Sequence, residues 1–195
     1  MKRFGFFALI LLAAGAATAA AASNHSSAPS AARCGGLTWR LKTFSDTRRA
    51  RVNATPQQTT ISWVRQRSGP ARPLQTRSTP FQLQSWEVPA QVTSYRLDAT
   101  GSVRLVLFDD GAYINAVIPS PTCLSAKSRD RAAISDAWHL FVDKCGKPTD
   151  QWQSLGAIFF VSGVGFWGPR GVSRGGAPNG AELHPVTGLR IVAGC

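Results

Sequence analysis

Acidic residues are scarce in this chain. It has ten aspartates and glutamates against 22 lysines and arginines, and its formal net charge is +12. The ten acids are widely spread, whereas an enzyme that holds a divalent cation needs clustered carboxylates. The composition therefore argues against metal-dependent hydrolysis. It favours an anionic partner, either a polymer such as nucleic acid or polysaccharide or an envelope surface.

Metal-binding patterns are also missing. The four cysteines include no C-x-x-C pair and the three histidines are scattered, so neither a zinc site nor another metal or cofactor is expected. An even number of cysteines instead predicts two disulfides, formed in an oxidising compartment. Three pairings are possible. We favour Cys123–Cys145, closing a short helical excursion, with Cys34–Cys195 tying the two ends of the domain.

Only one long apolar run is present, from Phe4 to about Ala17, behind Lys2 and Arg3. It is short for a membrane span and leads into small residues, so residues 1–22 are predicted to be a signal peptide. A retained N-terminal anchor is the alternative. The Ser/Ala/Pro-rich stretch 23–33 predicts a flexible leader and residues 34–195 a single domain. The mature protein is then expected to have no transmembrane segment and to be exported, either secreted or periplasmic.

Strands dominate the middle of the chain. Apolar and polar residues alternate with a period of two on both sides of Pro89, which predicts one long, bent strand. The Asp109–Gly111 sequence is a tight hairpin signal between two further strands. The predicted strands of this meander cover residues 82–97, 102–108 and 112–118.

One convincing helix follows, over residues 129–142, with Ser128 as its expected N-cap and apolar residues spaced i, i+3, i+4 and i+7. Strands are predicted at 155–167, where glycines suggest a bulge or tight curvature, and at 188–192. This order predicts a mainly β fold, an OB-like five-stranded barrel with one helix between strands three and four. Segments 38–44 and 57–67 are interpreted as extra N-terminal strand segments.

Three segments carry a family resemblance: 116–123, 161–167 (VSGVGFW) and 176–186 (GAPNGAELHPV). They resemble a family of uncharacterised secreted bacterial proteins with a C-terminal signature GVGFFD…HGQxGxAPNGIELHPVL. The resemblance covers most of the mature chain and is most specific in its last 35 residues. The family has no established biochemical activity, so the resemblance implies secretion and supplies little mechanism.

This chain departs from the family pattern at polar positions. It has Arg104 where relatives carry a histidine, Val117 where they carry a glutamate, and Gly171 near a second family histidine. Only Glu182 and His184 remain of the polar residues that could build a catalytic centre. The departures favour a degenerate or non-catalytic member of the family.

Two functions use the same region differently. In a nuclease-like hydrolase of a phosphodiester or glycosidic polymer, His184 would act as general base or acid, oriented by Glu182. The structural alternative is that both residues bond turn amides and carbonyls at the start of a strand. In a binding domain, the face of strands two and three, with the adjoining loops, would hold the polymer. The candidate ligand-binding residues of that face are Arg104, Tyr113, Asn115, Trp167, Arg170 and Arg174.

We favour the exported, non-catalytic binding or structural domain and keep the hydrolase as the alternative hypothesis. The two hypotheses share one geometric requirement. Glu182, His184 and Arg104 should converge on one open pocket. Dispersal of the three, or burial in turn hydrogen bonds, would weaken both.

Overall fold

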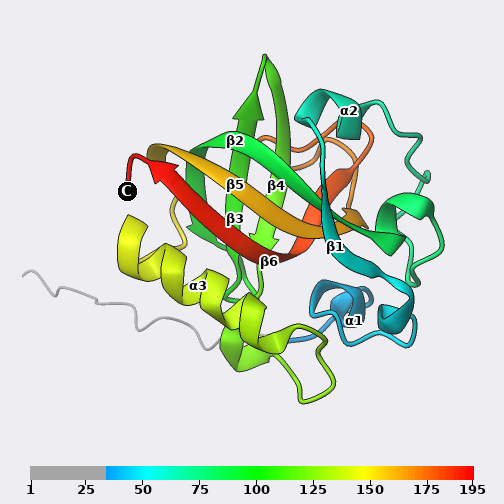
Figure 1. Cartoon of the computed structure of the whole chain (residues 1–195). Helices are drawn as coiled ribbons and strands as arrows, with labels where there is room; N and C mark the ends of the chain where they lie inside the picture. The colour runs from blue at the N-terminus through cyan, green and yellow to red at the C-terminus, as the bar shows by residue number, and fades with distance from the viewer. Residues whose placement is uncertain (1–33) are drawn as a thin grey trace, which may run out of the picture. The chain divides into compact units, whose positions relative to one another are not determined.

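The structure is a computed structural model that describes residues 34–195 (Figure 1). The predicted signal peptide and leader lie outside the described residues. Residues 34–195 belong to one compact unit. Within residues 34–195, no helix is both long enough and apolar enough to cross a membrane.

The N-terminal third contains short helices as well as one strand. Its elements are α1 (Trp39–Lys42), the 3-10 helix η1 (Arg49–Arg51), β1 (Asn53–Gln58), α2 (Ile61–Arg65) and the 3-10 helix η2 (Pro80–Leu83). The strand predicted at 38–44 is wrong, because Leu41 and Phe44 bury their side chains at helical spacing. The 57–67 segment ends its strand at Gln58, and α2 begins after Thr60, whose hydroxyl caps the backbone N–H of Trp63.

The predicted meander, helix and closing strands are present, with changed bounds. They are β2 (Gln84–Leu97), β3 (Val103–Asp109), β4 (Ala112–Ile118), α3 (Arg131–Cys145), β5 (Gln153–Trp167) and β6 (Ala181–Ala193), with the 3-10 helix η3 (Pro121–Cys123) after β4. The last strand is longer than the predicted 188–192 and includes Glu182 and His184. The N-cap of α3 is Asp130, so the prediction of Ser128 is wrong. Ser128 instead accepts the backbone N–H of Ser125.

The strands form a six-stranded mixed sheet in which five strands make a near-closed ring. The order is β1-β2-β3-β4-β6-β5, and β2 also pairs with β5. Neighbours in the ring are antiparallel except β4 and β6, which pair in parallel through two residue pairs. The β3–β4 hairpin turns at Asp110 and Gly111, whose φ angles of 44° and 71° suit a primed turn. β1 is added outside the ring, parallel to β2.

The core lies inside this ring. β3 turns Val103, Leu105 and Leu107 inward, as its period-two pattern predicts. α3 packs beside β6, and its buried Phe141 meets Tyr95 with ring centroids 5.0 Å apart (Figure 1). The helix therefore covers one end of the ring with its apolar face.

Two disulfides are present, as predicted, but their favoured pairing is wrong. The bonds join Cys34 to Cys123 and Cys145 to Cys195. Cys145 is the last residue of a 15-residue helix. At 1.5 Å per residue, that helix carries the chain about 22 Å away from its start, beyond disulfide reach of the residues that precede it. The helix therefore separates Cys123 from Cys145 instead of bringing them together.

The glycines of β5 mark the irregular stretch that the sequence predicts. The pairing of β5 with β6 shifts register on both sides of Gly163. Gly165 has no room for a side chain, because a Cβ there would overlap the carbonyl oxygen of Phe81.

Gly165→Ala should therefore lower the free energy of unfolding by about 1–3 kcal/mol, since the backbone of η2 must move away. Gly188→Ala on β6 is the matched control, because its Cβ would meet the Cβ of Ser162 at an ordinary 3.5 Å. Urea denaturation of both variants under oxidising conditions measures the difference. Equal stabilities would show that the contact between β5 and η2 is not tight in solution.

Candidate functional site

Arg104 and Glu182 meet on the outer face of the ring. Arg104 lies on β3 opposite Val117 of β4, and β4 in turn pairs Asn115 with Glu182 of β6. One guanidinium nitrogen of Arg104 lies 3.3 Å from Oε1 of Glu182, and their side chains are 14% and 6% exposed. The sequence placed both residues in one candidate site, and the structure brings them together.

His184 lies behind this pair. Its side chain is 2% exposed, and its ring packs against Phe166 with centroids 5.4 Å apart. Nδ1 is 4.0 Å from Oε2 of Glu182, which is an electrostatic contact and too long for a hydrogen bond. Nδ1 has no hydrogen-bond partner in residues 34–195. Of the three residues expected to share an open pocket, His184 is the one that stays enclosed.

Burial and the neighbouring charges set the protonation states of Glu182 and His184. Desolvation lowers the pKa of His184 to about 4, with Lys42 and Arg104 acting in the same direction and Glu182 opposing them. Burial alone would raise the pKa of Glu182, but His184, Arg104 and Lys42 together bring it below its ordinary value. Near neutral pH the pair is therefore a carboxylate beside a neutral imidazole.

A hollow of about 300 Å³ opens in front of Glu182. α1 lies on one side with Lys42, whose ammonium is 5.8 Å from the centre of the Phe166 ring. Pro73 and Pro169 line the hollow from two loops. Arg104 and Glu182 also line it, whereas His184 does not. We call this space the Glu182 hollow.

Two other hollows adjoin the Glu182 hollow. It shares Leu37 and Gln75 with a hollow of about 260 Å³, which shares Arg40 and Thr47 with a third of about 540 Å³. Trp39, Arg49 and Lys127 are among the residues that line the third. Each of the three is lined by at least one residue of α1. We call this series of neighbouring hollows, from Lys127 past Arg40 to Glu182, the basic groove.

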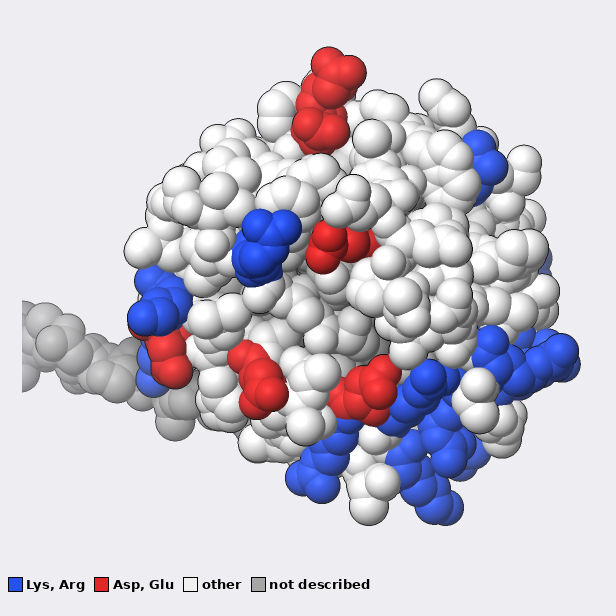
Figure 2. All heavy atoms as spheres, in the orientation of Figure 1, with Lys and Arg blue, Asp and Glu red and all other residues white. Residues whose placement is uncertain are grey.

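Positive charge is concentrated beside this groove. Residues 34–80 contain nine lysines and arginines and one acidic residue, Asp46. Residues 81–195 contain ten lysines and arginines and nine acidic residues. Asp46 is itself neutralised by an ion pair with the buried Arg77. Lysine and arginine side chains gather in Figure 2 on the side where Figure 1 shows α1. Almost all of the chain's described charge excess therefore lies in the segment that precedes the ring.

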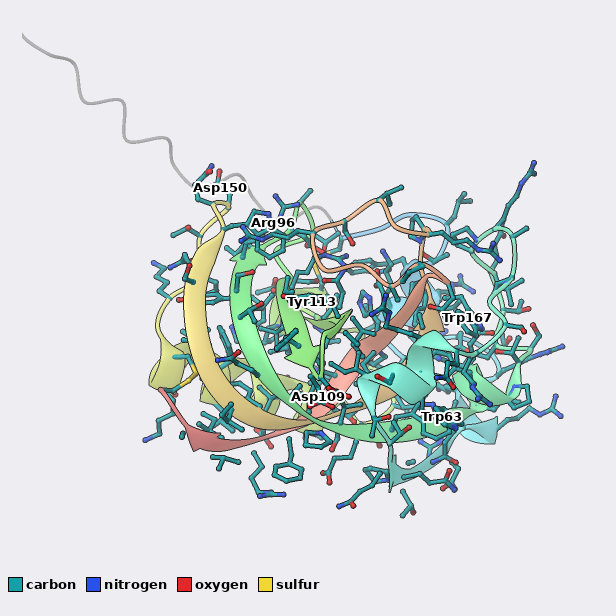
Figure 3. All side chains as sticks on the ribbon, turned by 90° about the horizontal axis from the view of Figure 1, so that it is seen from above. Trp63, Arg96, Asp109, Tyr113, Asp150 and Trp167 are labelled. Atoms are coloured by element: carbon teal, nitrogen blue, oxygen red, sulfur yellow. A yellow bond between two sulfur atoms is a disulfide. The ribbon has the colours of Figure 1, made fainter. Side chains whose placement is uncertain are left out.

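The other predicted ligand-binding residues are dispersed. Trp167 is 2% exposed and donates its indole N–H to the Thr79 hydroxyl at 2.9 Å. Asn115 is buried and donates to the Ser173 hydroxyl at 2.6 Å. Tyr113 is exposed and stacks beside Phe108, away from Trp167 (Figure 3). Trp167 and Asn115 are thus structural contacts in this conformation.

Residues 168–180, which connect β5 to β6, hold the two predicted loop arginines. Arg170 donates to the carbonyl oxygens of Gly69 and Pro70 at 2.6 and 3.2 Å. Arg174 lies over Trp152, its guanidinium carbon 5.4 Å from a ring centre. Ser173 binds the outward side chain of Asn115, so this loop covers part of the face that the sequence predicts as open.

The turn at residues 177–180 (APNG) joins α2 to the start of β6 through hydrogen bonds. Asn179 donates its side-chain amide to the carbonyl oxygens of Val64 and Arg67, both at 2.9 Å, and accepts the backbone N–H of Ala181 at 3.1 Å. It therefore satisfies carbonyls at the end of α2 and fixes the start of β6. The turn positions Glu182 without facing the hollow itself.

Sequence reasoning missed Lys42, Arg40 and Trp39. All three come from α1 and its start, a segment that was interpreted as a strand. The concentration of positive charge in residues 34–80 was the available signal. Among residues 34–195, no group of three His, Cys, Asp or Glu side chains is placed to hold a metal ion.

The similarity found between this chain and known proteins is structural and distant. No protein-family model and no curated protein matches the chain, so the family resemblance stays a prediction. Among solved structures, the chain is similar to one assigned as an aspartyl-tRNA synthetase from Leishmania major Friedlin, at 12% identity and a TM-score of 0.42. The match covers 72% of this chain and 21% of that one.

Proposed function

We propose that the ring of five strands is an OB-like barrel. An OB fold is a five-stranded Greek-key barrel that is partly open. Three strands of the ring precede α3 and two follow it, and β6 lies between β4 and β5. This order supports the proposal independently of any similarity to another protein.

On this barrel we propose an exported, non-catalytic binding domain that holds an anionic polymer in the basic groove. The observation that carries the proposal is the series of three neighbouring hollows lined by residues of the most basic segment of the chain. A basic groove with low-dielectric walls concentrates anions and steers their approach. The two disulfides support a location in an oxidising compartment, either the periplasm or outside the cell.

The enclosure of His184 supports a non-catalytic role. A general base has to come within hydrogen-bond reach of the proton that it removes, directly or through one water molecule. His184 is 2% exposed, and Glu182 stands between it and the hollow. A carboxylate paired with Arg104 is also a weak base.

Salt-dependent binding tests the proposal. Fluorescent fragments of alginate, polyphosphate and oligo-dT should bind the oxidised protein, with affinities that fall as salt rises. Arg40→Gln combined with Lys127→Gln should lower each affinity roughly tenfold or more at low salt, and should flatten the slope of log K against log salt by about 2. Both side chains are exposed and line the groove.

The matched control is Lys144→Gln combined with Lys147→Gln. It removes the same charge from exposed lysines that line none of the three hollows of the groove. An equal loss of affinity in both double variants would locate binding outside the groove. Failure of all three polyanions to bind at low salt would reject the proposed function.

A further inference from the structure

The inner end of the basic groove differs from the rest of it. Among the residues that line the groove, the carboxylate other than Glu182 is that of Asp46, which is paired with Arg77. At the inner end lies Glu182, an ionised carboxylate that is 6% exposed. Its Oε1 is held by Arg104, and its Oε2 lies 4.0 Å from Nδ1 of His184, too far for a good hydrogen bond. Because Glu182 lines the hollow, its carboxylate can still accept a hydrogen bond from a ligand bound there.

The same hollow also has spare cationic donors. The Lys42 ammonium makes no hydrogen bond within residues 34–195; it lies near the Phe166 ring and acts electrostatically on Glu182 and His184. Arg104 has five N–H donors, and its side chain uses NH1 alone, toward Glu182. The hollow thus offers two cations for an anion and one carboxylate oxygen for a hydroxyl or ammonium group. A ligand that satisfies it carries both kinds of group.

We propose that the Glu182 hollow binds one carboxylated sugar unit, a uronate, of an acidic polysaccharide. The carboxylate of the unit meets Lys42 and Arg104, and a ring hydroxyl donates to Glu182 Oε2. Pro73 and Pro169 provide apolar walls for a face of the ring. A volume of about 300 Å³ is at the small end for ligand sites, which suits a single unit. This inference rests on the proposed function, because the polymer has to lie in the basic groove.

The groove suits a polysaccharide better than a nucleic acid. Proteins that bind single strands without sequence preference stack the bases on accessible aromatic side chains. Of the six tryptophans, all of which lie in residues 34–195, only Trp39 lines the groove, and it is half-buried, so a run of stacking positions is missing. A phosphodiester group has no hydrogen-bond donor of its own for Glu182. A uronate brings a carboxylate and hydroxyls on one ring.

The experiment compares ratios of affinities. Alginate, which consists of uronate units, is measured against polyphosphate and oligo-dT fragments of matched charge on the oxidised full domain. The wild type should prefer alginate at least tenfold. Glu182→Gln and Lys42→Gln should each reduce this preference at least fivefold, because each removes a contact that only the uronate makes. A change of net charge affects all three polymers alike and therefore cancels in the ratio of affinities. Arg40→Gln combined with Lys127→Gln should weaken all three polymers and leave the ratio unchanged.

The outcomes separate the inference from the proposed function. Binding of all three polymers without preference, or a preference that survives both single variants, overturns the uronate site and leaves the groove. Preference for oligo-dT overturns it in favour of a nucleic acid. The Lys42 side chain is half-buried and makes no hydrogen bond within residues 34–195, so Lys42→Gln keeps the test decisive if Glu182→Gln does not fold. Failure of all three to bind rejects both proposals.

Discussion

Arg77→Met is expected to lower the free energy of unfolding by about 3–5 kcal/mol, although Arg77 contacts no hollow of the basic groove. The arginine is fully buried, and its Nε lies 3.0 Å from Oδ2 of Asp46. Its terminal nitrogens donate to the carbonyl oxygens of Leu41 at 2.7 Å and of Gln82 and Gly165 at 3.4 Å. One side chain thus joins α1, η2 and β5.

Arg77→Met should lower the free energy of unfolding because it leaves a buried carboxylate without its partner. Methionine fills much of the volume but leaves Asp46, which is 6% exposed, without its charged partner. Removing one member of a buried ion pair is far more destabilising than replacing both. Burial lowers the pKa of the Arg77 guanidinium, and Asp46 counteracts this effect and so helps to keep the guanidinium charged.

Urea denaturation of the oxidised protein measures the effect, with Arg72→Met, at an exposed position, as the control. Adding Asp46→Leu to Arg77→Met should recover part of the loss, which a double-mutant cycle would report as coupling between the two sites. A loss below 1 kcal/mol for Arg77→Met, with no coupling to Asp46, would show that the N-terminal segment is not anchored through this pair.

The ring could be predicted from the sequence because its pattern is local. Alternation with a period of two identifies β2, β3 and β4, and the helical period identifies α3, whatever lies around them. The N-terminal helices have three to five residues each, too few for a periodic pattern to show. Long-range contacts such as Arg77 with Gly165, 88 residues apart, decide their form.

The candidate site was found in part for the same reason. Glu182 and His184 stand out because they are two apart beside a distinctive turn, and Arg104 because it lies on a well-predicted strand. Lys42 reaches the same hollow from α1 across long stretches of sequence, and no local pattern gives that contact. The wrong disulfide pairing has a related cause, because the length of α3 decides which cysteines can meet.

Acid is expected to destabilise the fold through His184. The imidazole takes up a proton near pH 6.5 in the unfolded chain but near pH 4 in the folded one. The unfolded state therefore binds more protons between these values, so stability is complete above pH 6.5 and falls as the pH approaches 4. The shift corresponds to about 3 kcal/mol in total. Protonation of Glu182, whose pKa is also lowered, acts in the same direction at lower pH.

The groups that face His184 make the prediction specific. Lys42 from α1 and Arg104 from β3 disfavour the imidazolium, and Glu182 from β6 favours it without offsetting burial. His184→Gln should remove most of the decline in unfolding free energy between pH 6.5 and 4, even if the variant is less stable at pH 7. His139→Gln, on the exposed side of α3, should leave the decline unchanged.

Equilibrium unfolding in urea at several pH values, on the oxidised protein, measures both slopes. A His184→Gln variant that retains the wild-type slope would assign the decline to carboxylates and would mean that the imidazole is reached by water. The buried pair behind the Glu182 hollow would then be open to solvent, and His184 would regain the access that a general base needs. The pH dependence of stability therefore also discriminates between the binding hypothesis and the hydrolase.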